Sequence, residues 1–306
     1  MFAFLLKRLL SVAGVLCCVL TVTFLLLRVS PGGPFTRERK VPEAIEKQLL
    51  AKYRLDGSLW EQYTHYISDV LRGDLRLSTK FRDRSVNALL AQSLPISATL
   101  GLCALLLSTL LGVWLGSLAA IRHRSGVDTA AMLSALVLIS VPTFVTGPLL
   151  VLCFALWLRW LPVGGWHSPS SLVLPTITMA GPAIASIARL MRTSLLEVLE
   201  SPFIRTAWAK GVSESRVLYI HALKIAIVPV ISYLGPLAAN LLTGSIVVEA
   251  IFNLPGTGSF FVNAIVNRDV FLLGGVVLVY SALLVTMNLL VDLAYTWIDP
   301  RIRLES

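Results

Sequence analysis

The chain has 306 residues, of which 56% are hydrophobic and 14% charged, and its mean hydropathy is +0.79. A soluble domain usually carries about 25% charged residues. Apolar runs of about 20 residues recur here, so a soluble globular protein is excluded and a polytopic helical membrane protein is predicted. The net charge of +9 gathers beside these runs, which favours contact with membrane lipids and predicts no nucleic-acid partner.

An uncharged run over residues 9–27 follows directly after Lys7 and Arg8. At about 1.5 Å per residue it spans about 28 Å, which is enough to cross the hydrocarbon core. The next residues, 28–34, offer no small-residue cleavage site of the kind that ends a signal peptide. We therefore expect residues 1–28 to form an uncleaved N-terminal transmembrane helix.

Residues 29–93 form the long polar segment of the chain, and they contain an amphipathic stretch over 42–53 and a second one after it. Ser58 and Glu61 make a capping box at the start of the second stretch, and Gly73 ends it. Four apolar residues recur along it at helical spacing: Leu59, Tyr63, Tyr66 and Val70. The segment is expected to be a small extramembrane subdomain, and the aromatic stripe to form its own core or an interfacial anchor rather than a ligand site.

Residues 94–306 are expected to hold five further spans and to complete a six-helix, all-α membrane protein. These spans are residues 96–121, 129–157, 171–191, 224–248 and 271–295. Gly112 and Gly116 repeat at four-residue spacing, which puts small residues on one helix face and predicts close helix packing in lipid. Pro142 is expected to kink the third span.

The basic residues predict the orientation of the chain in the membrane. Lys and Arg crowd the short segments on the side of the two termini, whereas the opposite short loops hold only Arg159 and Arg268. Short loops rich in Lys and Arg face the cytoplasm. Both termini and the loop 193–222 are therefore expected in the cytoplasm, and residues 29–93 outside it.

Within this loop, Ser201 and Pro202 form a helix start and Gly211 a helix stop. Ser213 can begin a second helix that runs on into apolar sequence. A short helix between membrane spans cannot bury itself against its own neighbours in sequence. The pattern leaves two alternatives open, which are a docking element for a soluble partner and an interfacial helix resting on lipid headgroups.

No catalytic or nucleotide-binding motif is present. The run 255–259, Pro-Gly-Thr-Gly-Ser, approaches a phosphate-binding loop but lacks its lysine, so Gly256 and Gly258 are interpreted as turn residues. The four cysteines lie in apolar runs, and Asp292 is interpreted as a partner for another helix rather than a proton relay. We expect a non-catalytic chain with no metal or cofactor of its own, driven by something else.

The loop sequence 203–211, Phe-Ile-Arg-Thr-Ala-Trp-Ala-Lys-Gly, followed by residues 221–224 and Pro229, resembles the cytoplasmic coupling loop of ABC-importer permeases of the dipeptide and oligopeptide branch. Further passages agree with that branch in order along the chain: 31–36, 73–75, 94–95, 249–258, 268–269 and 298–303. The resemblance covers nearly the whole length. The run 34–39 is most similar to oligopeptide-permease subunits.

The resemblance implies a heteromeric importer with the type I permease fold in a bacterial inner membrane. Its other parts are a second homologous permease subunit, two ABC ATPase subunits that bind ATP and Mg²⁺, and an extracytoplasmic peptide-binding protein. An ATPase groove would receive helix 202–210. The implied coupling residues are Phe203, Ile204, Arg205, Thr206, Ala207, Trp208, Lys210 and Gly211.

By helical spacing, Phe203, Ala207 and Lys210 share one face of this helix, and Ile204 and Trp208 share the adjacent one. The small side chain of Ala207 is expected to allow close approach of a partner. Two positions depart from the family pattern. Trp208 stands where arginine is frequent, and Arg76 follows Gly-Asp-Leu where glycine is common.

Polar residues on the spans are candidates for a pore lining or for hydrogen bonds between helices, and the second interpretation is favoured. They are Ser140, Thr143, Asn240, Thr243 and Glu249. Residues expected to act structurally are Gly112, Gly116, Pro142, Pro229, Gly256 and Gly258.

Three other functions compete with oligopeptide import. An importer of the same branch could carry dipeptides, a metal chelate or glutathione, which the pore sequence does not distinguish. A self-powered secondary carrier is disfavoured because neither internal repeats nor mid-membrane ion sites are visible. A membrane enzyme is disfavoured because no catalytic cluster is present.

Overall fold

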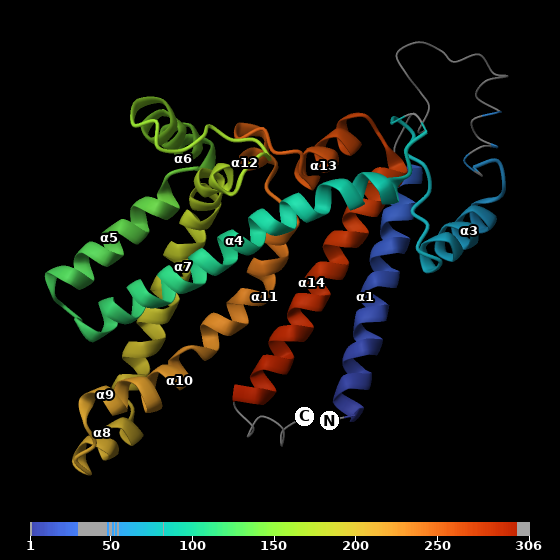
Figure 1. The fold of residues 1–306 in the computed structure, drawn as a ribbon. Coiled ribbons are helices and arrows are strands. Elements are labelled where there is room, and N and C mark those ends of the chain that lie inside the picture. The colour runs from blue at the N-terminus through green and yellow to red at the C-terminus, as the bar shows by residue number, and fades with distance from the viewer. Residues whose placement is uncertain are drawn as a thin grey trace. The chain divides into compact units, whose positions relative to one another are not determined.

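The computed structural model describes residues 2–29, 48, 51, 53, 55–81 and 83–298 (Figure 1). In this part of the chain the regular elements are helices, accompanied by an isolated antiparallel bridge between Leu77 and Ser85. The all-α prediction is thus confirmed. Most of the predicted amphipathic stretch 42–53, the motif 31–36 and the tail 299–306 lie outside the described residues.

The α-helices are α1 (Phe2–Val29), α3 (Leu59–Leu71), α4 (Val86–Ile121), α5 (Gly126–Ser140), α6 (Thr143–Leu150), α7 (Val173–Leu199), α8 (Pro202–Ala209), α9 (Glu214–Arg216), α10 (Leu223–Ala226), α11 (Val228–Leu242), α12 (Ile246–Ile251), α13 (Thr257–Val266) and α14 (Val270–Ile298). Two π-helical turns, Val151–Trp157 and Val217–Ala222, and one 3₁₀ turn, Pro169–Leu172, join some of them.

Four helical stretches of the described part are long and apolar enough to cross a membrane. They are Val86–Ile121, Pro169–Leu199, Val228–Ile251 and Val270–Val291. The uncharged part of α1 adds the apolar stretch Leu10–Leu25. Because α4 begins at Val86, the predicted boundary between residues 93 and 94 falls inside a continuous helix. The fourth span continues to Leu199, beyond its predicted end at residue 191.

The predicted third span is broken rather than kinked. Its halves, Gly126–Ser140 and Thr143–Trp157, meet at an angle of 103°, so that they form a fifth span only if the pair is counted together. Pro142 is the N-cap of α6, and the residue before it, Val141, is extended with φ −86° and ψ 117°. A proline disfavours helical geometry in the residue before it and starts a helix readily, so the chain bends here.

The chain divides into two compact units. Unit 1 contains Met1–Ile96 and Gly256–Leu283, and unit 2 contains Ser97–Pro255 and Leu284–Ser306. Helices α4 and α14 each contribute to both units.

In unit 1, α3 packs on α1. The Ser58 hydroxyl accepts from the backbone N–H of Glu61 at 3.3 Å, and Glu61 Oε2 accepts from the N–H of Ser58 at 2.8 Å, which confirms the capping box. Tyr66 is buried against Leu20 and Phe24 of α1. Of the predicted stripe, Tyr63 and Val70 join this cluster, whereas Leu59 stays 64% exposed.

The motif Gly73-Asp74-Leu75 forms a turn that Asn87 holds. Gly73 has φ +77°, which glycine adopts at little cost. Asn87 Nδ2 donates to the carbonyl of Gly73 at 2.6 Å, and Asn87 Oδ1 accepts from the N–H of Leu75 at 2.8 Å. The turn therefore fixes the entry of the chain into α4.

Asp269, from the motif 268–269, ties two parts of unit 1 together. Its carboxylate is buried and accepts from the backbone N–H of Leu272 at 3.2 Å, which caps the start of α14. It also accepts from the hydroxyl of Ser78 and, at 3.2 Å, from the N–H of Thr79. One side chain thus caps a helix and anchors the segment before α4.

Helix α7 is the most buried of the four spans, with 67% of its apolar window inside the structure. A Cβ added at Gly116 of α4 would lie 2.3 Å from the carbonyl oxygen of Ala188, and one at Gly112 would lie 2.7 Å from Ile187 Cβ. Real side chains do not approach that closely, so α4 reaches α7 only because glycine is present. The predicted packing role of Gly112 and Gly116 is confirmed.

We expect Gly116→Ala to lower the unfolding free energy by about 1–3 kcal/mol, because the added methyl group forces α4 away from α7. The matched control is Gly126→Ala, where an added Cβ meets nothing within 4 Å. Thermal unfolding of the purified chain in mild detergent measures both. Equal melting temperatures for the two variants would contradict the close-contact assignment.

Candidate functional site

Helix α8 is built by local signals at both ends. Ser201 is its N-cap residue with extended geometry (φ −69°, ψ 150°), and Pro202 is its first residue. The Ser201 hydroxyl, however, donates to the carbonyl of Val198 and makes no capping bond to α8. At the other end Gly211 has φ +76° and donates to the carbonyl of Trp208 at 2.9 Å.

The N–H of Val212 then reaches back to the carbonyl of Ala207 at 3.2 Å. With the bond from Gly211 to Trp208, this is a Schellman motif, which satisfies carbonyls that a helix end would otherwise leave free. The predicted helix and its glycine stop are confirmed, and the loop after α8 turns back sharply on it.

One face of α8 packs against the interior of unit 2. Ile204 is completely buried in the main apolar cluster, together with Val217, and Ala207 packs half-buried against the same cluster. Ala207 therefore contributes to the inner face of α8, and its expected role as a point of close approach for a partner stays a prediction. Ile204 belongs to one of the two faces predicted for α8 and Ala207 to the other. The strip of α8 that packs against unit 2 therefore runs through both faces.

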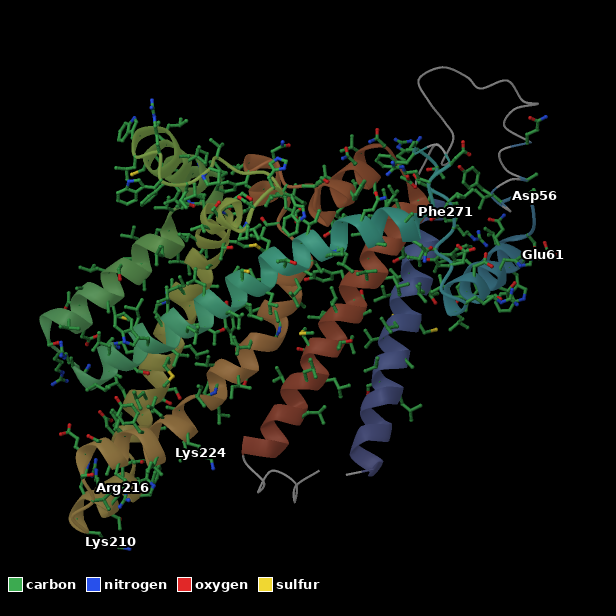
Figure 2. The ribbon with its side chains drawn as sticks, in the orientation of Figure 1. Asp56, Glu61, Lys210, Arg216, Lys224 and Phe271 are labelled. Atoms are coloured by element: carbon green, nitrogen blue, oxygen red, sulfur yellow. The ribbon has the colours of Figure 1, made fainter. Side chains whose placement is uncertain are left out.

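The rest of α8 is open. Phe203 is 44% exposed and Trp208 45% exposed, and these aromatic side chains flank the buried line on either side. The remaining outward positions are Arg205, Thr206 and Lys210, and all three are exposed. Figure 2 labels Lys210 with Arg216 and Lys224, the basic residues that follow on this loop. The outer surface of the loop is thus aromatic and basic.

After α8 the chain re-enters unit 2 through the π-helical turn Val217–Ala222. Val217 and Ala222 are buried, whereas Tyr219 is 67% exposed and Ile220 57% exposed. Pro229 follows in the first turn of α11, where its missing N–H costs little. The predicted fifth span thus divides into α10 and α11, and Pro229 lies where α11 begins.

An ion pair that the sequence did not predict joins the start of α5 to α7. Arg192 donates from Nε to Asp128 Oδ1 at 2.6 Å and from its second nitrogen to Oδ2 at 2.8 Å. Asp128 is 5% exposed and also accepts from the backbone N–H of Arg124 at 3.1 Å, and His123 Nδ1 lies 3.2 Å from it. The opposite charges at the ends of adjacent predicted spans were the signal that could have revealed it.

Glu249 is a buried carboxylate in the described part of the chain. It is 1% exposed in α12, and its Oε1 accepts from the Ser97 hydroxyl of α4 at 2.6 Å. A Cβ at Gly244, which has φ +90°, would lie within 3 Å of both side chains. The glycine therefore makes room for the buried carboxylate, and Glu249 joins α12 to α4 by a hydrogen bond, in agreement with the favoured interpretation; a pore role for Glu249 stays a prediction.

The other polar positions on the spans differ from one another. Asn240 on α11 and Ser140 at the end of α5 are exposed. The hydroxyl of Thr243 donates to the carbonyls of Ala239 and Asn240, both at 3.0 Å, within its own helix turn. Thr143 is half-buried at the start of α6, so the break at Pro142 separates it from Ser140. A pore lining remains a prediction for these positions.

The run 255–259 begins a helix. Gly256 is the N-cap of α13 and Gly258 lies in its first turn, so the run starts a helix where a turn was predicted; both glycines are buried in unit 1. Among the described residues, no group of three or more His, Cys, Asp or Glu side chains is placed to hold a metal ion.

The chain is similar to known transport proteins along essentially its whole length. The family described as "Binding-protein-dependent transport system inner membrane component" matches residues 112–304. The oligopeptide transport system permease protein OppB of Haemophilus influenzae is 43% identical over 99% of this chain and 100% of its own length. OppB of Escherichia coli K12 is 42% identical over 99% of this chain and all of its own. The dipeptide transport system permease protein DppB of Bacillus subtilis is 42% identical over 100% of this chain and 99% of its own.

We expect the pair Asp128 and Arg192 to show a coupling free energy of about 1–3 kcal/mol in a double-mutant cycle, because their bidentate hydrogen bonds are largely shielded from water. The cycle uses Asp128→Asn, Arg192→Gln and the double variant. Thermal unfolding of each chain in detergent gives the four stabilities. Additive losses, with no coupling, would mean that the two side chains do not hold α5 to α7.

Proposed function

Because this chain belongs to the family of binding-protein-dependent transport system inner membrane components, we propose that it is the transmembrane permease subunit of an ATP-driven importer of oligopeptides. The single observation that carries the substrate class is identity of 42–43% over essentially full length to relatives named as oligopeptide permeases. The ordered motifs along the chain support the same assignment.

The chain itself would supply part of the transport pathway and the helix that the ATPase subunits contact, whereas those subunits would supply the energy. We expect a second permease subunit to complete the pore, and two ATPase subunits to bind ATP and Mg²⁺ and to hydrolyse the nucleotide. An extracytoplasmic binding protein would deliver the peptide. Both termini and α8 would face the cytoplasm, which the basic surface of Lys210, Arg216 and Lys224 supports.

In this mechanism α8 transmits the motion of the ATPase subunits. The exposed rings of Phe203 and Trp208 offer apolar area for a groove on the partner, and aromatic side chains are typical anchors of such interfaces. The buried Ile204 and the Schellman motif after Trp208 support a rigid attachment of α8 to unit 2. A push on the outer face would then move α7 and the start of α11 together.

Dipeptide import is the second candidate, and the similarity to a dipeptide permease of Bacillus subtilis favours it. The two candidates share the mechanism and differ in the length of the peptide. Uptake of labelled di-, tri- and pentapeptides by cells that express the complete transporter distinguishes them. Transport of dipeptides alone would replace the oligopeptide assignment.

We expect the double variant Phe203→Ser with Trp208→Ser to insert normally but to lose peptide uptake, because the ATPase subunits no longer gain apolar contact with α8. Co-purification of the ATPase subunits in mild detergent should fall in parallel. The control is Trp160→Ser, which removes an indole that is 71% exposed in a loop expected on the other side of the membrane. Normal uptake and co-purification by the double variant would refute the docking role.

Ala207→Glu should act differently from the outer-face variant. The carboxylate would be forced toward the apolar cluster that holds Ile204, so we expect lower stability of the chain itself, by about 1–3 kcal/mol. Unfolding of the isolated permease, without partner subunits, measures this loss. An unchanged melting temperature would return Ala207 to the partner-facing surface.

The pore assignment is tested by Asn240→Leu, which replaces an exposed amide on α11 by an apolar side chain of similar size. If Asn240 lines the pathway, uptake should fall while ATPase subunits still co-purify. Thr243→Val is measured in parallel, and a smaller effect on uptake is expected because the Thr243 hydroxyl bonds to its own helix turn. Unchanged uptake of every peptide by Asn240→Leu would end the assignment.

A further inference from the structure

One side of α3 carries apolar residues that the core of unit 1 covers only in part or leaves exposed. Trp60, Tyr63, Ile67 and Leu71 follow one another at helical spacing, and we call them the apolar flank. Trp60 is 72% exposed and Leu71 80% exposed. Both side chains are among the most exposed large apolar residues of the described part of the chain.

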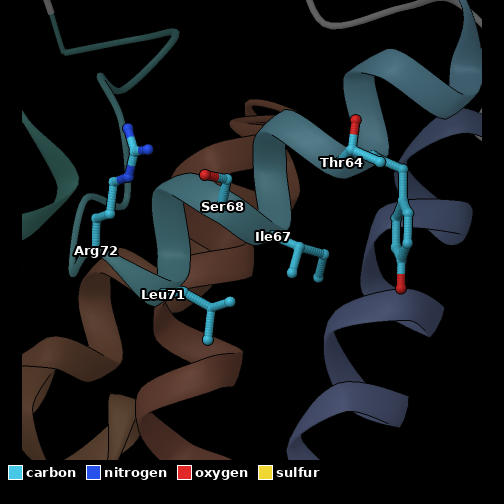
Figure 3. A pocket seen from close by; sticks show the side chains of 6 residues that line it. Thr64, Ile67, Ser68, Leu71 and Arg72 are labelled. Carbon is cyan, nitrogen blue, oxygen red and sulfur yellow. The ribbon is translucent and has the colours of Figure 1, made fainter.

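The apolar flank borders a shallow pocket lined by Tyr63, Thr64, Ile67, Ser68, Leu71 and Arg72. Figure 3 shows Ile67 and Leu71 pointing to the same side of α3, whereas Thr64, Ser68 and Arg72 point away from that side. The helix therefore separates apolar from polar side chains even outside its contact with the core.

The position of α3 along α1 gives the depth at which the apolar flank lies relative to the end of the apolar run of α1. The Tyr63 ring contacts Phe24 with a centroid distance of 5.3 Å, and its hydroxyl lies 2.8 Å from the Thr21 hydroxyl. The uncharged run of α1 continues to Leu27, six residues beyond Thr21. At about 1.5 Å per residue, the Tyr63 hydroxyl lies about 9 Å inside the end of that run.

The Tyr63 side chain also shows toward which end of α1 the apolar flank points. Its side chain runs from the level of Phe24 toward the level of Thr21, which is toward the middle of the apolar run. Ile67 and Leu71 follow Tyr63 at four and eight residues and so project to the same side. At this level, Val22 and Leu25 of α1 are themselves 47% and 54% exposed, as expected for a helix side that faces lipid.

We propose that α3 is an interfacial helix whose apolar flank inserts into the headgroup and acyl-chain boundary of the membrane leaflet in which α1 ends. Amphipathic helices of this kind bury their apolar face about 5–10 Å into that boundary, which matches the depth given by α1. A water-soluble partner does not reach below the end of the apolar run. Insertion of α3 requires only that α1 crosses a membrane, and it does not depend on which substrate the transporter carries.

The test uses nitroxide labels on the full chain in vesicles of phosphatidylethanolamine and phosphatidylglycerol. Cys17, Cys18, Cys103 and Cys153 are first replaced by alanine. Leu71→Cys then reports on the apolar flank, and His65→Cys, an exposed position on the polar side of α3, is the matched control. Oxygen partitions into hydrocarbon, whereas a nickel chelate stays in water.

We expect the ratio of oxygen to nickel collision rates to be severalfold higher at Leu71 than at His65. Equal ratios at the two positions would overturn the proposal. Exclusion of both reagents from Leu71 in the assembled transporter would also overturn it, since protein rather than lipid would then cover the apolar flank.

Trp60 gives a second measurement that needs no cysteine. Brominated phospholipids quench indoles that lie near their bromine atoms. The wild-type chain should lose more fluorescence in vesicles of brominated phosphatidylcholine than Trp60→Phe, because Trp60 lies on the apolar flank. Subtracting the emission of Trp60→Phe from that of the wild-type chain isolates Trp60, because the other tryptophans are common to both chains. Emission of Trp60 that the bromine atoms leave unchanged would place Trp60 outside the membrane and contradict the proposal.

Discussion

The contact of α4 with α7 at Gly112 and Gly116 is the constraint on which the rest of unit 2 depends. In lipid, helices gain little from hiding apolar side chains, so van der Waals contact between backbones has to hold them together. The carbonyl of Ala188 occupies the space that any side chain at Gly116 would need. This contact fixes α7 as the buried axis of the unit, and the loop that carries α8 begins where α7 ends.

The stiffness of the coupling loop follows from that axis. Leu195 near the end of α7, Ile204 of α8 and Val217 after it are buried in one cluster, so three segments of the loop share a core. The ion pair of Asp128 with Arg192 holds α5 to the same region of α7. A helix fixed on its inner face in this way moves together with its surroundings, as the proposed coupling to ATPase subunits requires.

Features that depend on short stretches of sequence could be predicted well. Hydropathy predicted the long apolar helices but not the break at Pro142. The capping box of Ser58 and Glu61 predicted the start of α3 and Gly211 the end of α8, because neighbouring residues supply each signal. Features that need a distant partner could not be predicted. Periodicity could not tell that Ala207 faces inward, and a carboxylate at the end of a span gave no sign that Glu249 is buried beside Ser97.

Arg76 stands at a position whose backbone conformation favours glycine. It has φ +67°, a left-handed conformation that costs a residue other than glycine about 1–2 kcal/mol. Here the side chain offsets that cost. Its Nε donates to Asp69 at 2.8 Å, and its guanidinium carbon lies 5.3 Å from the ring centroid of Phe271. Asp69 lies on α3 and Phe271 on α14, and both belong to unit 1. The Arg76 side chain therefore links these two helices, which a glycine at this position could not do.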